Sequence, residues 1–207
     1  DALDFIMVLP EGVTDSTGSQ YWNATEWCCG VATDKPDDST YLTGLIDEAK
    51  QRFNIDPDRV YFMGHSNGGF MSYRMACDHS EVVSAIVSIA GSGFEDASRC
   101  DVDQTVSVLQ VHGTSDSVVD YDGSDGDYPG AREIAGRWAN RNGCDSSSTT
   151  GDNIDIVRLS GAETAVETWT GCRDGSAVKL WSIEGGRHLP GIRSNFTPST
   201  LEFLLAH

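Results

Sequence analysis

Between Val60 and Cys77 the chain reads Val-Tyr-Phe-Met-Gly-His-Ser-Asn-Gly-Gly-Phe-Met-Ser-Tyr-Arg-Met-Ala-Cys. A short apolar run leads into Gly64-His65-Ser66-Asn67-Gly68, and a stretch compatible with a helix follows. A sharp turn from a strand into a helix lifts a serine hydroxyl clear of a sheet, and glycines at the flanking positions leave room for that turn. The unpaired amides at the start of the helix would face the turn and stabilise negative charge there. The stretch therefore predicts a nucleophile elbow with Ser66 at its tip.

The rest of the chain alternates apolar runs with segments of helical periodicity. We predict helices over residues 38–53 and 130–142, the second stopped by Gly143, and a third helix starting at Thr197-Pro198. We predict strands at residues 5–9, 60–63, 82–89, 106–111, 154–159, 165–170 and 178–183. Residues 11–37 are expected to form a long loop, and a loop of that length in a compact domain usually has a function. The alternation predicts a single α/β domain over residues 1–207.

Composition excludes several classes of protein. The chain has 32 acidic and 14 basic residues and a formal net charge of −18, which would repel the phosphates of a nucleic acid. No run approaches the roughly 20 apolar residues that span a bilayer, so we expect no membrane partner. The cysteines show no CxxC spacing and there is no HExxH motif, so we expect no zinc site. We expect no metal and no organic cofactor, because a serine nucleophile with its base and its acid requires neither. Their even number favours disulfides and a secreted, extracellular protein.

A serine nucleophile needs a base and a carboxylate that orients the base. Among the five histidines, His188 follows a predicted strand and a glycine-rich loop at the carboxyl edge of the sheet, where α/β folds place their sites. His65 lies inside the elbow, and His112 ends a strand, where an imidazole commonly bonds backbone. We therefore predict His188 as the base.

The carboxylate is expected at Asp116, which follows the predicted strand at residues 106–111; Asp120 and Asp122 are the alternatives. The chain order Ser66, Asp116, His188 is the α/β-hydrolase order.

Several motifs together resemble one family. They are Tyr21-Trp-Asn-Ala, Cys28-Cys-Gly30, Gly64-His-Ser-Asn-Gly-Gly-Phe-Met-Ser-Tyr-Arg-Met-Ala-Cys77, Val108-Leu-Gln-Val-His-Gly-Thr-Ser-Asp116, Tyr121-Asp-Gly123, Asn142-Gly-Cys144 and Glu184-Gly-Gly-Arg-His188. The chain resembles the secreted α/β-hydrolases grouped as polyhydroxybutyrate depolymerases and feruloyl or acetylxylan esterases of the carbohydrate esterase family 1 type. The resemblance implies an α/β-hydrolase fold with a mostly parallel central sheet flanked by helices. It also implies Ser66 as nucleophile, Asp116 as acid, His188 as base and the Asn67 amide as one oxyanion donor.

The function that this resemblance implies is a secreted serine carboxylesterase acting on feruloyl or acetyl esters of plant polysaccharide. A polyhydroxybutyrate or polyester depolymerase is the alternative, and a non-catalytic carbohydrate- or surface-binding relative is the alternative from another class. For substrate contacts we select Tyr21, Trp22 and Trp27 in the early loop and His65 in the elbow; packing beneath the loop is the competing role for the aromatic residues.

The chain departs from the family pattern in two places. Members usually carry a His-Gly turn, upstream of the strand corresponding to Phe5–Leu9, whose backbone gives the second oxyanion donor, and no such turn precedes Phe5. The strand leading to that turn lies between the counterparts of Phe5–Leu9 and Val60–Met63, so we expect an upstream polypeptide that completes the sheet, either a cleaved companion or a preceding segment of the same chain. The second departure from the family pattern is His188-Leu-Pro-Gly191, which lacks an aromatic residue that the family often has.

The cysteines suggest a disulfide framework with one open choice. We predict a Cys144–Cys172 bridge, because it would join the end of a helix to the strand region that packs near it. Cys28 and Cys29 are then expected to pair with Cys77 and Cys100, in an order that the sequence leaves open.

Overall fold

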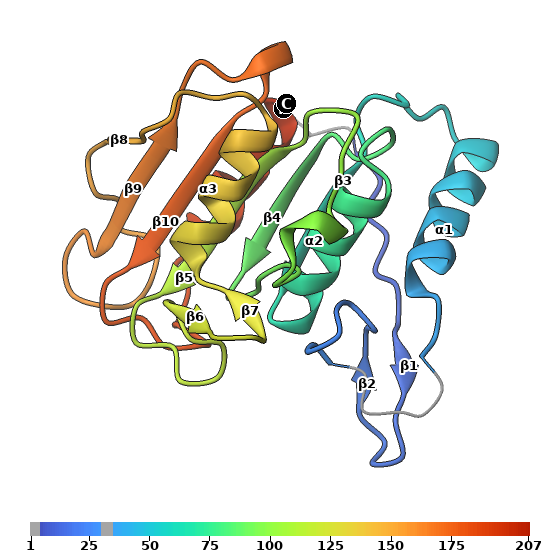
Figure 1. The fold of residues 1–207 in the computed structure, drawn as a ribbon, viewed down its shortest axis with the longest axis horizontal. Coiled ribbons are helices and arrows are strands. Elements are labelled where there is room, and N and C mark those ends of the chain that lie inside the picture. The colour runs from blue at the N-terminus through green and yellow to red at the C-terminus, as the bar shows by residue number, and fades with distance from the viewer. Residues whose placement is uncertain (1–4, 30–34) are drawn as a thin grey trace.

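The computed structural model describes residues 5–29 and 35–207. Its centre is a six-stranded sheet in the order β3-β4-β5-β10-β9-β8 (Figure 1). The first four are parallel: β3 (Tyr61–His65), β4 (Ala85–Ile89), β5 (Ser107–Gly113) and β10 (Val178–Ile183). The antiparallel strands are β9 (Thr164–Trp169) and β8 (Thr149–Thr150). The predicted α/β class with a mostly parallel sheet is confirmed.

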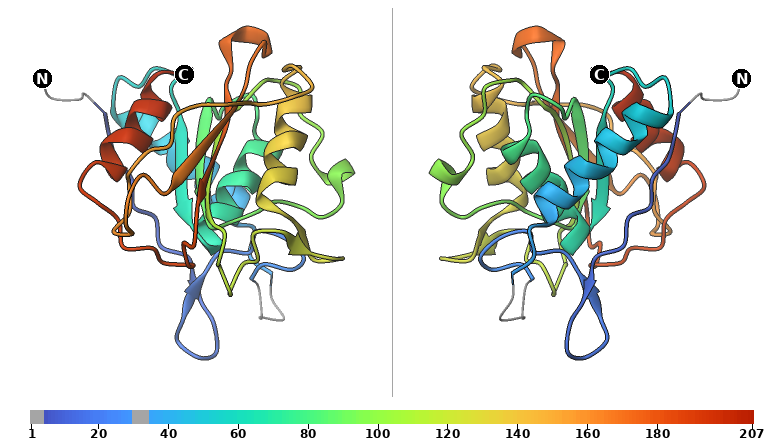
Figure 2. Two further views of the ribbon diagram at one scale, coloured as in Figure 1. Left: turned by 90° about the vertical axis from the view of Figure 1, so that its left-hand side faces the viewer. Right: turned by 90° about the vertical axis from the view of Figure 1, so that its right-hand side faces the viewer.

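Helices cover both faces of this sheet. Helices α2 (Asn67–Asp78) and α3 (Ala131–Arg141) lie on one face, and α4 (Phe196–Leu205) lies on the opposite face (Figure 2). Helix α1 (Asp38–Arg52) lies beside α2, at the β3 end of the sheet. Smaller elements are two hairpins, β1 (Val13–Thr14) with β2 (Gln20–Tyr21) and β6 (Gly123–Ser124) with β7 (Tyr128–Pro129), and two 3-10 turns, Ala97–Arg99 and Arg173–Gly175. None of the helices in the described residues is long and apolar enough to cross a membrane.

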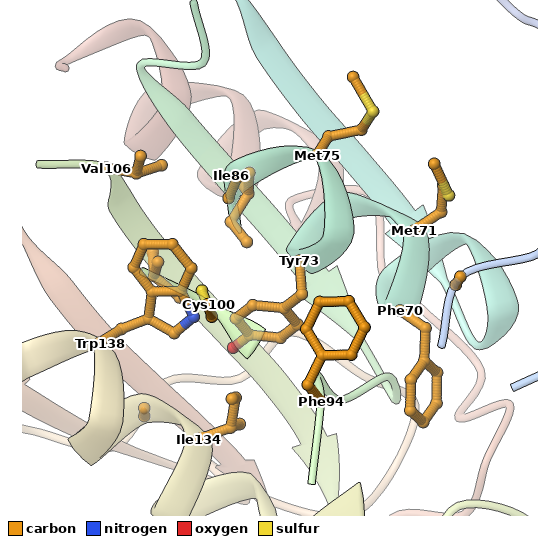
Figure 3. Close-up of a cluster of buried hydrophobic side chains, with 14 of the residues drawn as sticks. Phe70, Met71, Tyr73, Met75, Ile86, Phe94, Cys100, Val106, Ile134 and Trp138 are labelled. Atoms are coloured by element: carbon orange, nitrogen blue, oxygen red, sulfur yellow. The ribbon is translucent and has the colours of Figure 1, made fainter. Parts of the chain in front are cut away.

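Two apolar cores hold the layers together. Between the sheet and helices α2 and α3, one core contains Phe70, Tyr73, Trp138 and Ile86 of β4, with the Tyr73 ring stacked on Trp138 (Figure 3). On the other face, β4 and β5 pack against α4 through side chains that include Leu109 and Phe203. Complete burial of a side chain such as Phe70 or Ile86 stabilises the fold by about 1.5–3 kcal/mol. Strands buried on both faces explain the unbroken apolar runs in the sequence.

Most predicted elements are present, with small shifts at their ends. Helix α3 is followed by Gly143 with φ +65°, which is the predicted stop. Strand β4 begins only at Ala85, because the amides of Val82 and Val83 bond the carbonyl of His79 in a turn. Helix α4 starts at Phe196, so that Pro198 is its third residue rather than its first.

Two predicted strands are wrong. Residues Phe5–Leu9 form no strand and their side chains are exposed, although β3 offers a free edge in the described part of the sheet. Residues 154–159 make only single bridges, and the backbone of Ile156 bonds Arg193 of a loop instead of a strand. An apolar run becomes a strand only when a neighbouring strand pairs with it, and the sequence pattern does not reveal the neighbour.

Two of the three predicted disulfides are wrong. Cys144–Cys172 forms as expected, but the other two bridges are Cys77–Cys100 and the adjacent pair Cys28–Cys29. The sulfur of Cys28 lies 3.5 Å from the Asn67 side chain, at the start of α2. Cys77 is ten residues further along that helix, about 15 Å away at 1.5 Å per residue. Cys28 therefore cannot reach Cys77, whereas the Cα atoms of Cys77 and Cys100 are 4.9 Å apart.

Candidate active site

Ser66 occupies the strained turn that the sequence predicts. It follows β3 directly, its φ is +55° and its ψ is −119°, and its amide donates to the Ile89 carbonyl at 2.8 Å. A positive φ is unusual for a residue with a Cβ and is typical of functional turns. A Cβ on Gly64 would lie 2.1 Å from the Gly68 carbonyl oxygen, so only glycine fits at that position.

The second glycine that the elbow requires is not the predicted one. A Cβ on Gly68 would meet no atom within 4 Å. A Cβ on Gly69 would lie 2.7 Å from Ser88 Oγ and 3.1 Å from Gly91 Cα. The glycine is therefore needed where α2 packs against the end of β4, one residue later than expected.

The loops that follow the neighbouring strands β5 and β10 are tied to each other. The Thr114 amide donates to the Ile183 carbonyl, and the Ser115 amide donates to the Gly186 carbonyl, both at 2.9 Å. A Cβ on Gly113 would lie 2.3 Å from the Gly186 carbonyl oxygen. These contacts hold the loop that carries Asp116 against the loop that carries His188.

The structure brings Ser66, His188 and Asp116 together at the carboxyl edge of the sheet. Ser66 Oγ lies 2.9 Å from His188 Nε2, and His188 Nδ1 lies 2.8 Å from Asp116 Oδ2. An ionised carboxylate only accepts, so Nδ1 carries the imidazole proton and the Nε2 lone pair faces the serine hydroxyl. The alternative Asp120 lies outside this cluster, and its carboxylate instead accepts from the amide of the other alternative, Asp122.

Asp116 is held as a carboxylate. Burial of its side chain, which has no exposed surface, would raise the pKa of the carboxyl group. Hydrogen bonds from His112, His188 and the amides of Val118 and Val119 outweigh burial and lower that pKa well below its usual value. The negative charge therefore persists and can stabilise an imidazolium at His188.

Asn67 contributes to the site through both its backbone and its side chain. Its amide is at the first helical position, and no hydrogen bond within residues 5–29 and 35–207 uses it. Its side chain clamps the early loop: Oδ1 accepts from the Trp22 amide at 2.6 Å, and Nδ2 donates to the Trp22 carbonyl at 2.8 Å. A free amide beside Ser66 at a helix N-terminus suits a developing oxyanion.

The four predicted substrate contacts fall in different places. Tyr21 is buried, and Trp22 stacks on Tyr41. Trp27 is 40% exposed and rests on Tyr128, with ring centroids 4.4 Å apart. His65 Nε2 donates to the His188 carbonyl at 2.8 Å. Of the three aromatic residues, Trp27 thus best combines an exposed side chain with a position near the start of α2.

Sequence reasoning missed the polar residues beneath Asp116. His112 Nε2 bonds the Val119 carbonyl at 2.9 Å, as expected of a backbone-bonding histidine, but it also lies 3.4 Å from Asp116 Oδ2. The available signal was Gln110 and His112 at positions i and i+2 of a strand expected to be buried. Such spacing places two polar side chains on one face of the strand.

The described residues contain no group of three His, Cys, Asp or Glu side chains placed to hold a metal ion. A hydroxyl, an imidazole and a carboxylate in this order can form and release a covalent acyl intermediate.

The sequence is similar to one protein family and to known esterases. Residues 34–101 match the model of the prolyl oligopeptidase family. The chain is 30% identical over 203 residues to feruloyl esterase B of Piromyces equi, an alignment that covers 90% of this chain and 34% of that protein. It is 27% identical over 190 residues to a bifunctional acetylxylan esterase/xylanase of Neocallimastix patriciarum, covering 92% of this chain and 25% of that protein. The chain thus spans a quarter to a third of the length of these two relatives.

The fold also matches a solved structure. An acetyl xylan esterase from Aspergillus awamori superposes with a TM-score of 0.61 at 16% identity, over 82% of this chain and 68% of that one. At this identity the likeness bears on the fold alone. The chain thus has the α/β-hydrolase fold and is similar in sequence to esterases of the feruloyl esterase type.

Proposed function

We propose that this chain is a serine carboxylesterase that hydrolyses feruloyl or acetyl esters of plant polysaccharide. The observation that carries the proposal is the continuous hydrogen-bonded line from Asp116 through His188 to Ser66, at the N-terminus of α2. The names of the two esterase relatives support an ester over an amide bond, which the same three residues could also cleave.

The mechanism follows from the directions of these hydrogen bonds. Ser66 Oγ attacks the ester carbonyl while His188 Nε2 takes its proton, and Asp116 stabilises the resulting imidazolium. The Asn67 amide stabilises the tetrahedral oxyanion. His188 then protonates the leaving alcohol, and a water molecule activated by the same imidazole releases the acid from Ser66.

The choice of acyl group rests on the surface around Ser66. Trp27 packs on Phe70, which lies one helical turn after Ser66. The exposed ring of Trp27 could stack on a phenolic acyl group. Leu189, directly after His188, is 75% exposed and supports the alternative of a polyhydroxybutyrate or other polyester surface. Activity on methyl ferulate and acetylated xylan, with none on hydroxybutyrate oligomers, would favour the first substrate class.

The nucleophile can be tested directly. A fluorophosphonate probe is expected to modify Ser66, and Ser66→Ala is expected to lower kcat by at least about a thousandfold, as removal of a triad serine does elsewhere. Labelling followed by peptide mass spectrometry identifies the modified residue. Absence of labelling would instead favour a non-catalytic binding protein, and activity within about tenfold of the parent in Ser66→Ala would exclude Ser66 as the nucleophile.

A companion polypeptide strand is part of the proposal. β3 has no neighbour on its outer side in the described residues, and the apolar side chains of Phe5–Leu9 are exposed beside that end of the sheet. An extended segment pairing there would cover both and, as the family resemblance implies, supply the second oxyanion donor, which is worth about 2.7–4 kcal/mol of transition-state stabilisation. Purified protein with an intact mass of 22.3 kDa and full esterase activity would contradict this. The three disulfides support secretion into an oxidising compartment.

A further inference from the structure

A line of buried polar side chains runs beneath the candidate active site. Tyr73 of α2 donates its hydroxyl hydrogen to Gln110 Oε1 at 2.9 Å, and Gln110 Nε2 lies 3.0 Å from His112 Nδ1. The exposed fractions of the three residues are 1%, 0% and 1%. Burying polar groups costs free energy unless they are fully paired, so a line of three in the core calls for an explanation beyond packing.

The direction of every hydrogen bond in this line is fixed by two backbone carbonyl groups that contact it, those of Gly91 and Val119. Gln110 Nε2 also contacts the Gly91 carbonyl oxygen at 2.8 Å, and a carbonyl only accepts, so this atom is the amide nitrogen. Its second hydrogen therefore points at His112 Nδ1, which must accept. His112 must then carry its proton on Nε2, where the Val119 carbonyl accepts it at 2.9 Å.

This fixed proton lies beside the carboxylate of the catalytic cluster. His112 Nε2 is 3.4 Å from Asp116 Oδ2, the oxygen that accepts from His188 Nδ1. The turn is held at Val119 as well, because the Val119 amide donates to Asp116 Oδ1 at 3.0 Å while its carbonyl accepts from His112. A single imidazole N–H thus constrains both the carboxylate and the turn that presents it.

We propose that His112 is a positioning residue that acts through Asp116, and that Gln110 holds it in the tautomer this requires. The inference rests on the proposed function, since it assigns His112 a task only if Asp116 orients His188 during turnover. The Nε2–H tautomer places a hydrogen toward Asp116 Oδ2 and the Val119 carbonyl. The other tautomer would place a lone pair there and repel both oxygens.

A matched pair of variants separates the two ring nitrogens. In His112→Gln the longer amide can place a donor near the position of Nε2, whereas in His112→Asn the shorter amide reaches only the position of Nδ1. We expect His112→Asn to lower kcat by about 10- to 100-fold with little change in KM, the size seen when an orienting partner of a metal-bound histidine is removed. We expect His112→Gln to be more active than His112→Asn by at least about tenfold, which corresponds to about 1.4 kcal/mol.

A measurement on the unmodified protein tests the tautomer without any variant. A proton–nitrogen NMR correlation of the His112 ring is expected to show hydrogen on Nε2 and none on Nδ1. In the corresponding spectra of the two variants, the low-field proton of His188 Nδ1 is expected to persist in His112→Gln and to shift or broaden in His112→Asn. A proton found on His112 Nδ1 would overturn the inference even if both variants failed to fold.

The outcomes distinguish this inference from the proposed function. Ser66→Ala, assayed alongside, reports on the function alone: if it stays active, the function itself fails. If Ser66→Ala is inactive and the two His112 variants lose activity equally, in proportion to their loss of thermal stability, His112 is only a structural residue. Full activity in His112→Asn would overturn the inference as well.

Discussion

His65 Nε2 donates a hydrogen bond to the backbone carbonyl of His188 at 2.8 Å, and the two imidazole rings lie 4.7 Å apart. The residue immediately before Ser66 therefore anchors the loop that presents the histidine of the cluster. This bond occupies one of the two ring nitrogens of His65. It gives His65 a positioning role as an alternative to the substrate contact expected from the sequence.

We predict that His65→Ala lowers kcat more than it raises KM. A hydrogen bond worth about 0.5–1.5 kcal/mol corresponds to a fall of about 2- to 12-fold. His65→Gln, whose amide can still donate to the carbonyl, is expected to retain more of the activity. Steady-state kinetics on one ester decides the matter: a rise in KM at constant kcat would instead favour direct substrate contact.

We predict that the Asn67 side chain stabilises the early loop independently of its backbone amide. Asn67→Ala leaves the Trp22 amide without a partner and leaves the Trp22 carbonyl with only the Ala24 amide, so it is expected to lower the free energy of unfolding by about 1–3 kcal/mol. Cleavage near Trp22 in limited proteolysis should become faster. Asn67→Asp, which keeps the acceptor and loses the donor, should fall between the parent and Asn67→Ala in urea unfolding; equal stability of all three would refute the clamp.

The lowered pKa of Asp116 predicts how stability depends on pH. Because its pKa is lower in the folded than in the unfolded protein, the ionised carboxyl stabilises the fold above its unfolded pKa of about 3.9. This contribution is lost as the pH falls below that value toward the folded pKa. Asp116→Asn should therefore have a shallower fall in stability between about pH 5 and pH 2 than the parent.

Urea unfolding across that pH range measures the difference. Ser66→Ala is the control, because it leaves the hydrogen bonds to Asp116 in place while removing the proposed nucleophile. It is expected to follow the parent curve. Parallel curves for Asp116→Asn and the parent would contradict the prediction.

The disulfides are expected to differ in their effect on stability. Cys77–Cys100 joins residues 23 apart in sequence and Cys28–Cys29 joins neighbours, so only the first closes a loop in the unfolded chain. Replacing Cys77 and Cys100 by serine should lower the free energy of unfolding by about 2–4 kcal/mol, and the same change at Cys28 and Cys29 by less. Calorimetry measures both, and peptide mapping without reduction should recover Cys28 and Cys29 in one peptide lighter by two hydrogens.

The site could be predicted from the sequence because each of its parts follows a strand. Ser66 comes directly after β3, and Asp116 and His188 lie in the loops that follow β5 and β10; the carboxyl ends of parallel strands meet at one edge of a sheet. Local sequence thus sets their positions once the strands are recognised. The elbow glycine was misplaced by one residue because the close approach is made by Gly91, which no local pattern relates to Gly69.

What the sequence could not give depends on partners distant along the chain. Phe5–Leu9 has the composition of a strand but no neighbour in the described sheet. Cys28 was expected to link its loop to the core by a disulfide with Cys77 or Cys100, but the length of α2 separates it from Cys77. The role of His112 became visible only when the directions of its neighbours' hydrogen bonds could be followed to two carbonyl groups.

The contact between Gly113 and Gly186 has a consequence for engineering. Because a methyl group on Gly113 would collide with the Gly186 carbonyl, a segment that brings a residue larger than glycine to position 113 cannot be exchanged alone. Chimaeras that graft residues 113–119 together with residues 183–188 should keep both segments compatible. Single grafts would have to be screened for backbone clashes before any change of specificity is sought.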